Sequence, residues 1–434
     1  MRCRQFAQLA GTLAAWSLVF LFAALAAWQL AAAADAASEA ISSPSSEGGF
    51  SRLLAAAKRG NARAQFRLAT LYERGFGLPK SSARAAFWLR KAATQGYAKA
   101  ECDLGVDYQL GHGVRRDDAL AVLWFRRAAN QGNAIAQFNM GICYLRGYGV
   151  PKDTSTAIAW MRRAASRGYA RAENNLGVFY QSGHGVVRNY GTAARWFRKA
   201  CAQDNTGALV NLGNLYFYGQ GVPRNSRRAL DLYRKAAALG DSNAYYSAGS
   251  VYAARRTPPN YQKAMRWYLE GAAAGNNLAM DGVGWLYSNG LGVPKNYRKA
   301  MTWWRRAAAA GDGHGMGGVG WLYEMGYGAP QSYQKAMLWY EKGAAAGDAD
   351  SMARIGLLYE TGHGVKRNYA KALKWFKLAA VAGGPAGDFG IGEIYADGLG
   401  VPKNVPKARK WFGKAARKGY PPAIKALKAL AKAK

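Results

Sequence analysis

Histidines, cysteines and paired glycines are the residues of this 434-residue sequence whose types and spacing could do chemistry. His112, His184 and His363 each lie in the middle of a Gly-x-Gly pair. Histidines that converge within a few ångströms can bind zinc, and a glycine pair between a strand and a helix can cradle a phosphate group. Which chemistry applies depends on the elements that position each pair.

A tyrosine that recurs every 36 residues places these glycine pairs in a repeating unit. The series consists of Tyr72, Tyr108, Tyr144, Tyr180, Tyr216, Tyr252, Tyr287, Tyr323, Tyr359 and Tyr395, with one step of 35 residues (287 minus 252). Ten units follow one another, and such a period predicts a repeat architecture. The turn histidines are at least two units apart, and neighbouring helices pack about 10 Å apart, so these histidines cannot share a metal ion.

Each unit reads as two helices joined by the glycine pair. In the third unit, Ala136, Met140 and Tyr144 recur at i, i+4 and i+8, which predicts one buried helical face. Gly147 can take the left-handed conformation that ends this helix, and the Asp153 side chain can cap the next one. The capping position holds only capping residue types in all ten units: Ser81, Asp117, Asp153, Asn189, Asn225, Asn260, Asn296, Ser332, Asn368 and Asn404. The glycine pairs therefore follow helices instead of strands, which argues against a phosphate loop.

A single hairpin of this kind cannot stand alone, because its apolar faces stay exposed until neighbouring hairpins cover them. Small residues that recur every 36 positions allow the helices to approach closely: Gly105, Gly141, Gly177, Gly213 and Gly249. The sequence therefore predicts an all-α fold, a right-handed αα-hairpin solenoid of about ten 36-residue repeats over residues 51–420.

The repeated pattern resembles that of a known family. In the fourth unit it consists of Ala172, Leu176, Gly177, Tyr180, Gly183, Gly185, Val186, Asn189, Tyr190, Ala193, Trp196, Phe197 and Ala200. This pattern resembles the Sel-one-like repeat, a relative of the tetratricopeptide repeat. The resemblance implies an adaptor that holds partners in a superhelical groove and, in bacteria, is often exported. Some exported relatives join each hairpin by a disulfide, but Cys102, Cys143 and Cys201 lack that period, so packing alone must hold these hairpins.

Residues 1–34 have the features of an export signal. Arg2 and Arg4 precede a long uncharged segment that ends in small residues at Ala32–Ala34, which suit a cleavage site. Residues 9–28 are also long enough to cross a bilayer, so an uncleaved inner-membrane anchor is the alternative. Both alternatives place the repeats outside the cytoplasm, as a periplasmic, secreted or membrane-tethered protein.

Two segments flank the predicted solenoid, and one unit interrupts its pattern. Residues 35–50 are rich in Ser, Ala and Gly and predict a flexible linker. Residues 421–434 predict a basic capping helix whose lysines solvate the open end of the stack. In the sixth unit, Ala253–Pro259 replaces the expected Gly-x-Gly-Val-Pro turn.

Positive charge is the strongest compositional signal, with 60 Lys and Arg against 25 Asp and Glu. Positions expected to face the groove hold few basic residues, so the excess lies on the second helices, in pairs that repeat along the exterior. These pairs include Arg126, Arg127, Arg162, Arg163, Arg305 and Arg306. One interpretation is that these cations complement helix C-termini and keep the protein soluble. The other is a docking surface for an anionic lipid, a glycan or an acidic protein. The export signal argues against nucleic acid as a partner.

Two apolar groups on the groove side are candidates for partner binding. The third unit is wholly apolar on this side, with Ile135, Phe138, Ile142 and Leu145. The seventh and eighth units place Trp285 and Trp321 in equivalent positions. The alternative is that all these side chains pack against the neighbouring unit. His314 stands alone on the same side.

No set of residues predicts catalysis, a cofactor, a metal site or a small-molecule substrate. Two functions remain open. The first is a non-enzymatic exported adaptor, scaffold or regulator that binds a protein partner in the groove. The second is an envelope-binding protein whose basic exterior engages anionic lipid, lipopolysaccharide or cell-wall polymer. Exterior electrostatic binding should weaken with ionic strength, whereas aromatic groove binding should not.

Overall fold

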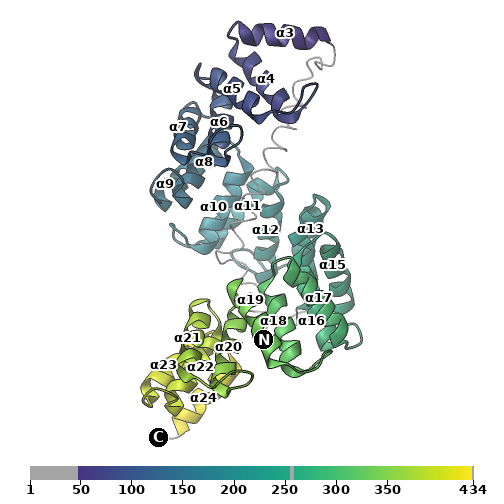
Figure 1. Ribbon diagram of the computed structural model, residues 1–434, viewed down its shortest axis with the longest axis vertical. Coiled ribbons are helices and arrows are strands. Elements are labelled where there is room, and N and C mark those ends of the chain that lie inside the picture. Colours follow the sequence, from purple (N-terminus) through teal and green to yellow (C-terminus); the bar gives the residue numbers. More distant parts are fainter. Residues whose placement is uncertain (1–46, 255–258, 433–434) are drawn as a thin grey trace. The chain divides into compact units, whose positions relative to one another are not determined.

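The computed structural model describes residues 47–254 and 259–432, which form 22 helices and contain no strand. These helices make two compact units, residues 47–241 and residues 242–432, and each unit is a stack of helical hairpins (Figure 1). The all-α repeat architecture predicted from the tyrosine period is therefore confirmed. No helix of the described residues is long and apolar enough to span a bilayer. The predicted export signal, residues 1–34, and its apolar segment, residues 9–28, lie outside the described residues.

Each repeat contributes a first and a second helix. The first helices are α4 (Ala62–Arg74), α6 (Ala98–Leu110), α8 (Ala134–Arg146), α10 (Ala170–Ser182), α12 (Thr206–Tyr218), α14 (Ser242–Ala253), α16 (Asn277–Asn289), α18 (Gly313–Met325), α20 (Ala349–Thr361) and α22 (Pro385–Asp397). The second helices are α5 (Ser82–Ala93), α7 (Asp118–Asn130), α9 (Thr154–Ser166), α11 (Tyr190–Cys201), α13 (Ser226–Ala238), α15 (Tyr261–Ala273), α17 (Tyr297–Ala309), α19 (Tyr333–Ala345), α21 (Tyr369–Val381) and α23 (Val405–Arg417).

One further helix precedes the repeats and one follows them. α24 (Pro421–Lys432) follows the last repeat, in the segment predicted to form the capping helix. α3 (Glu47–Lys58) precedes the first repeat and begins before the predicted boundary at Ser51. Residues 47–50 are therefore helical and do not belong to the linker, because Phe50 packs against the core of the first repeat.

The same two hydrogen bonds close every hairpin at its capping residue. In the third repeat, the Asp153 N–H donates to the Tyr144 carbonyl at 2.9 Å, and the Asp153 carboxylate accepts from the Thr156 N–H at 3.2 Å. Equivalent contacts occur in all ten repeats. Gly147 ends α8 in the left-handed conformation, with φ 78°. The capping residues and the helix-ending glycine predicted from the sequence are thus confirmed.

The glycine turns that follow the first one reach the preceding hairpin. A Cβ atom at Gly149 would lie 2.1 Å from the carbonyl oxygen of Asp118, so only glycine fits there. In the next repeat, His184 Nε2 lies 3.5 Å from Thr154 Oγ1. The His363 ring stacks on Tyr333 with ring centroids 4.9 Å apart. His184 and His363 therefore contribute contacts between repeats.

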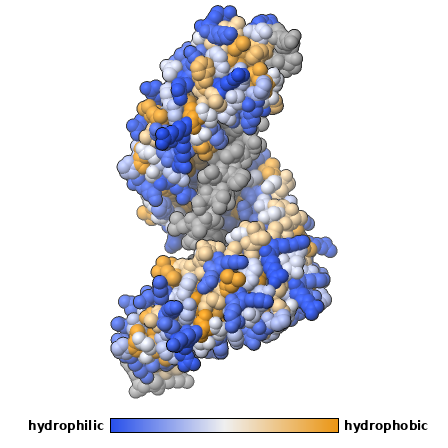
Figure 2. Space-filling model, in the orientation of Figure 1, coloured by the Kyte–Doolittle hydropathy of each residue, from blue (hydrophilic) through white to orange (hydrophobic). Residues whose placement is uncertain are grey.

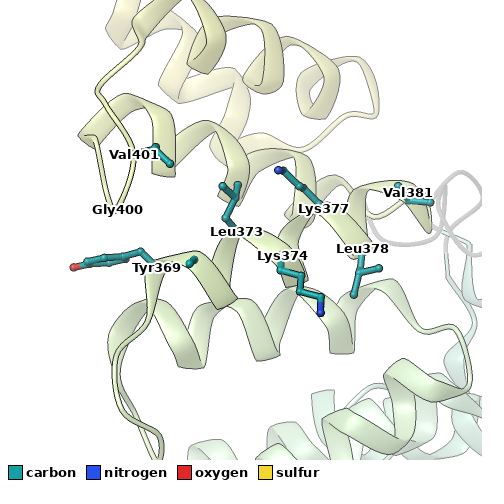
Figure 3. A pocket seen from close by; sticks show the side chains of 9 residues that line it. Tyr369, Leu373, Lys374, Lys377, Leu378, Val381, Gly400 and Val401 are labelled. Atoms are coloured by element: carbon teal, nitrogen blue, oxygen red, sulfur yellow. The ribbon is translucent and has the colours of Figure 1, made fainter.

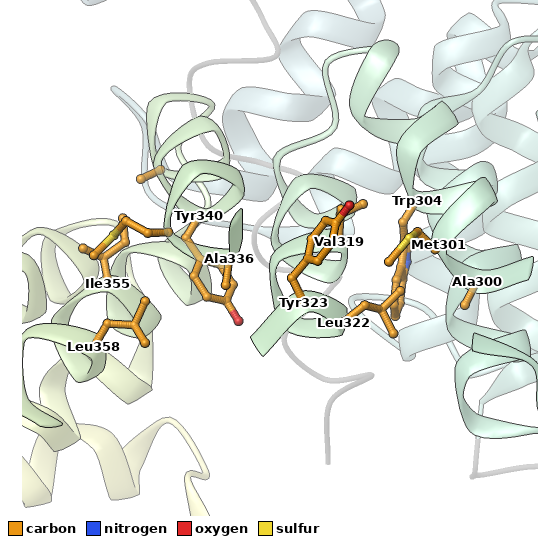
Figure 4. Packing of buried hydrophobic residues seen from close by; sticks show 12 residues of the cluster. Ala300, Met301, Trp304, Val319, Leu322, Tyr323, Ala336, Tyr340, Ile355 and Leu358 are labelled. Atoms are coloured by element: carbon orange, nitrogen blue, oxygen red, sulfur yellow. The ribbon is translucent and has the colours of Figure 1, made fainter. Parts of the chain in front are cut away.

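Buried aromatic side chains fill the space beside the recurring glycines. A Cβ atom at Gly177 would lie 2.4 Å from the ring of Phe197, which is fully buried. Gly213 has the same relation to Tyr233, at 2.5 Å. The close approach predicted from the glycine series is confirmed. Figure 4 shows how such side chains join into a continuous core from α17 to α20.

Several first helices of consecutive repeats contact one another more extensively than any two second helices do within the described residues. Such contacts join α10 to α12, α14 to α16, α16 to α18, α18 to α20 and α20 to α22. Within the described residues no contact of comparable extent joins two second helices. The first helices therefore form the closely packed side of each stack. We call their solvent-facing surface the inner wall and that of the second helices the outer face.

Candidate protein-binding surfaces

Aromatic side chains gather where the inner wall of the 242–432 unit meets its turns. We define the aromatic cluster as Trp285 and Trp321 on the first helices α16 and α18, together with Tyr297 at the start of α17 and Tyr327 in the turn after α18. All four rings are only partly buried, and Tyr327 is 39% exposed. The Trp321 ring lies 6.3 Å from Tyr297 and 5.5 Å from Tyr327, and these two tyrosines stack at 4.5 Å. Tyr297, Trp321 and Tyr327 are therefore held in place by contacts with one another, while part of the cluster faces solvent.

The two tryptophans also contribute to packing between repeats. The Trp321 ring meets the buried Trp304 edge to face at 6.3 Å, through the gap that Gly318 leaves between helices. Trp285 lies 6.3 Å from Tyr261 at the start of the preceding second helix. Each of the two rings therefore packs against a neighbouring repeat on one side and is exposed on the other. Packing between repeats and partner binding, the two alternatives left open by the sequence, thus each apply to part of the ring.

Three residues of the predicted apolar patch of the third repeat are partly exposed, and the fourth is buried. Ile135 is 36% exposed, and Ile142 and Leu145 are half-buried, so these three residues line the inner wall. Phe138 is only 8% exposed, because its ring packs edge to face against Tyr169 of the next repeat at 5.3 Å. Phe138 is therefore a core residue, and the prediction that it faces the groove is wrong.

Three asparagines on the inner wall of the 47–241 unit were not predicted from the sequence as binding residues. Asn139, Asn175 and Asn211 recur at 36-residue intervals on α8, α10 and α12, and all three are half-buried. Asn211 donates to Asn174 Oδ1 across the α10–α12 contact at 3.0 Å. The carboxamides of Asn139 and Asn175 bond to no other side chain within the described residues, so each still offers a donor and an acceptor. Their spacing, which equals the repeat period, is the signal that could have found them.

His314 on α18 does not stand alone, contrary to the prediction from the sequence. Its Nδ1 lies 2.9 Å from Asp281 Oδ1 of α16, and the imidazole is 33% exposed. Burial lowers the pKa of His314, but the carboxylates of Asp281, Asp348 and Asp312 outweigh burial and raise it from 6.5 to about 10. His314 is therefore charged at neutral pH and links two repeats along the inner wall. The sequence hid this pair because its members are 33 residues apart.

We expect this ion pair to make the stability of the 242–432 unit depend on pH. A raised histidine pKa stabilises the fold fully below pH 6.5, and the contribution is lost as pH rises toward about 10. His314→Gln should therefore lower the unfolding midpoint in urea most at pH 6 and much less at about pH 10. An equal loss at both pH values would show that the charge of His314 contributes nothing.

The basic pairs of the second helices contact tyrosines and tryptophans. Arg162 donates to the Tyr180 hydroxyl of the next repeat at 3.1 Å, and Arg305 donates to the Tyr323 hydroxyl at 2.8 Å. The second member of a pair lies over a tryptophan ring, as Arg163 does over Trp160 at 4.6 Å. The same stacking places Arg127 over Trp124 and Arg306 over Trp303, both at 4.8 Å.

The predicted exterior arginines are exposed on the outer face, and part of the charge has a structural use. Arg126, Arg127, Arg162, Arg163, Arg305 and Arg306 are all exposed. On the face shown in Figure 2, hydrophilic side chains are interspersed with apolar ones over both units. Since several of these cations hydrogen-bond to the next repeat or stack on a tryptophan of their own helix, they stabilise the solenoid besides keeping it soluble.

Neutralising one such pair should therefore cost stability. We expect Arg162→Gln with Arg163→Gln to lower the free energy of unfolding by about 1 kcal/mol, because one hydrogen bond and one cation–π contact are lost at an exposed site. Chemical denaturation of the full chain measures this change. A double variant as stable as the parent protein would mean that the pair is only a solvated surface.

The described residues offer little for catalysis. No group of three His, Cys, Asp or Glu side chains among them could hold a metal ion. Cys102, Cys143 and Cys201 are free thiols, and burial raises the pKa of Cys143 and of Cys201 to about 12, which disfavours the reactive thiolate. Glu324 is occupied structurally, since it accepts from the Tyr340 hydroxyl and lies 3.5 Å from Arg354.

The family comparison agrees with this geometry. The model of the family described as Sel1 repeat matches ten consecutive segments: residues 62–97, 98–133, 134–169, 170–205, 206–241, 242–276, 277–312, 314–348, 349–383 and 385–420. No curated protein matches the chain.

The chain is similar to two solved structures of repeat proteins. One is c5321, described as a protective antigen of uropathogenic Escherichia coli strains displaying an SLR fold, at 32% identity over 89% of this chain and 83% of that one, with a TM-score of 0.56. Another is a Sel1 repeat protein from Oxalobacter formigenes, at 29% identity over 71% of this chain and 90% of that one, with a TM-score of 0.48. The helical-hairpin repeat is a general protein-interaction scaffold.

Proposed function

The chain belongs to the Sel1 repeat family, and we propose that it is a non-catalytic scaffold that binds a protein partner along the inner wall of its repeats. The observation that carries this proposal is the aromatic cluster around Trp285 and Trp321. Its rings are partly exposed yet fixed by neighbouring rings. Rigid, partly exposed aromatic side chains are the anchors that most often dominate protein–protein binding, because little entropy is lost when they are covered.

The asparagines of the other unit suit the same kind of partner. A carboxamide donates and accepts hydrogen bonds, as a peptide bond does, so Asn139 and Asn175 are matched to the main chain of an extended segment. Successive first helices are about 10 Å apart, and three residues of an extended or polyproline chain span about 9–10 Å. One carboxamide per repeat can therefore meet every third residue of such a segment.

A second candidate function is binding to an anionic envelope polymer or lipid through the outer face. The exposed pairs, such as Arg126 and Arg127, support this candidate through their charge. However, the hydrogen bond from Arg162 to Tyr180 and the stacking of Arg163 on Trp160 already give such pairs a role in the fold. The inner wall is therefore the better supported surface.

A salt titration distinguishes the two candidates. The full chain is immobilised, bound proteins are captured from extracts of the cells that make it, and the bound fraction is followed as salt is raised. A partner held by the aromatic cluster should stay bound at about 1 M salt, where the Debye length is only about 3 Å. Complete release of every partner by moderate salt would instead favour the charged outer face.

We also propose that the repeats function outside the cytoplasm. The support is the order of Arg2 and Arg4, the apolar segment at residues 9–28 and the small residues near Ala34. A reporter fused after residue 46, before α3 begins, should be active only in its extracytoplasmic form. Strong activity of a cytoplasm-only reporter at this junction would refute the proposal.

A further inference from the structure

An apolar pocket lies on the outer face of the ninth repeat, away from the inner wall. It has a volume of about 360 Å³ and lies between α21 and the turn that follows α22 (Figure 3). Its apolar lining comes from Leu373, Leu378, Val381 and Val401, and Lys374 and Lys377 flank these side chains. Val381 is 88% exposed and Leu378 is 42% exposed, so the core of the repeat does not cover them.

The pocket exists where the ninth repeat departs from the pattern of the others. In six repeats a Lys or Arg lies over the tryptophan three residues before it, as Lys342 does over Trp339 at 4.5 Å. In the ninth repeat Leu378 occupies this position, three residues after Trp375. An exposed leucine thus replaces a cation that stabilises other repeats, without a gain for the packing of its own helix.

The chemistry of the pocket defines its occupant. A pocket of this size accepts one or two aliphatic side chains, which is how an amphipathic helix inserts its i and i+4 residues into a hydrophobic groove. Lys374 and Lys377 are exposed and form no ion pair within the described residues, so they favour carboxylates beside the inserted side chains. A bilayer would need a wider apolar surface than this local pocket offers.

We propose that this pocket binds an amphipathic helix of a partner protein, with leucine-type side chains in the pocket and acidic residues against Lys374 and Lys377. This second surface is independent of the inner wall. A scaffold with both surfaces can hold one partner on the inner wall and another on the outer face of the 242–432 unit.

A fluorescent 18-residue peptide with leucines at helical spacing flanked by glutamates is the first probe, and the same peptide with lysines in place of the glutamates is the second. In anisotropy titrations the full chain should bind the acidic peptide saturably. Leu378→Lys should weaken that binding at least tenfold, because it removes an apolar side chain from the lining of the pocket and puts a charged one in its place. Lys374→Glu with Lys377→Glu should reverse the preference between the two peptides.

The controls separate the pocket from the overall charge of the protein. Leu338→Lys adds the same charge at a leucine of α19 that is 51% exposed but outside the pocket, and it should leave binding unchanged. Since Leu378→Lys adds positive charge, a purely electrostatic association with the acidic peptide would not weaken. Unchanged or tighter binding by Leu378→Lys would therefore overturn the proposal. So would binding to phosphatidylglycerol vesicles that Leu378→Lys abolishes while neither peptide binds.

Discussion

Gly392→Ala should open the last repeat, because the added methyl group has no room. A Cβ atom at Gly392 on α22 would lie 2.4 Å from the ring of Phe412, which is 4% exposed and packed between α22 and its neighbours. Relieving such an overlap in a packed core costs about 2–3 kcal/mol. Since stability is local in a repeat protein, amide hydrogen exchange in α22 and α23 should accelerate by about 30- to 150-fold.

Gly413→Ala is the matched control, one residue from the same aromatic ring. A Cβ atom at Gly413 in α23 would meet nothing within 4 Å. Alanine is favoured over glycine in a helix by up to about 1 kcal/mol, so exchange in α23 should slow by up to about fivefold. If both substitutions slow exchange, then helix propensity and not ring packing determines the effect of alanine at these two positions.

Replacing Trp285 and Trp321 with alanine should weaken binding of the inner-wall partner by about 2–4 kcal/mol in total, or about 30- to 1000-fold. The reason is that the partner would lose the two largest rings of the aromatic cluster. Because Trp321 also packs against Trp304, the double variant should lose some stability, so its folding must be measured alongside binding. Circular dichroism supplies the first quantity and a quantitative pull-down the second.

Trp339→Ala separates the two effects. Trp339 on α19 packs partly buried against the same hydrophobic core as Trp321, but it lies on the outer face beneath Lys342. Its removal should cost comparable stability and leave partner binding intact. If Trp339→Ala weakens binding as much as the inner-wall variants do, then the loss reflects general destabilisation, and the aromatic cluster is not the binding site.

The repeat period allowed most of the fold to be predicted. Capping residues such as Asp153 and turn glycines such as Gly147 act through contacts with neighbours a few residues away, so their types and spacing were sufficient. The recurring glycines, including Gly177, revealed the close packing between the two helices of one hairpin. All of these features are set within a single repeat, which is why ten copies of one pattern identified them.

Contacts between repeats could not be predicted in the same way. The pairing of His314 with Asp281, the burial of Phe138 under Tyr169 and the bond from Arg162 to Tyr180 join residues 18 to 33 positions apart on different hairpins. Their formation depends on the rotation and spacing of one hairpin against the next. The sequence pattern shows which side of each helix is apolar, but it does not give this rotation and spacing. Side chains that the pattern assigned to the groove and the exterior therefore also form contacts between repeats.

Site-specific photo-crosslinking tests the binding role of the inner wall most directly. Benzoylphenylalanine is introduced at Trp285 on the inner wall and, in a separate variant, at Trp339 on the outer face, and each full-length protein is irradiated in the cells that make it. Binding along the inner wall predicts a discrete covalent adduct with another protein from position 285 and none from position 339. An adduct from position 339 alone would contradict it and would place the partner on the outer face.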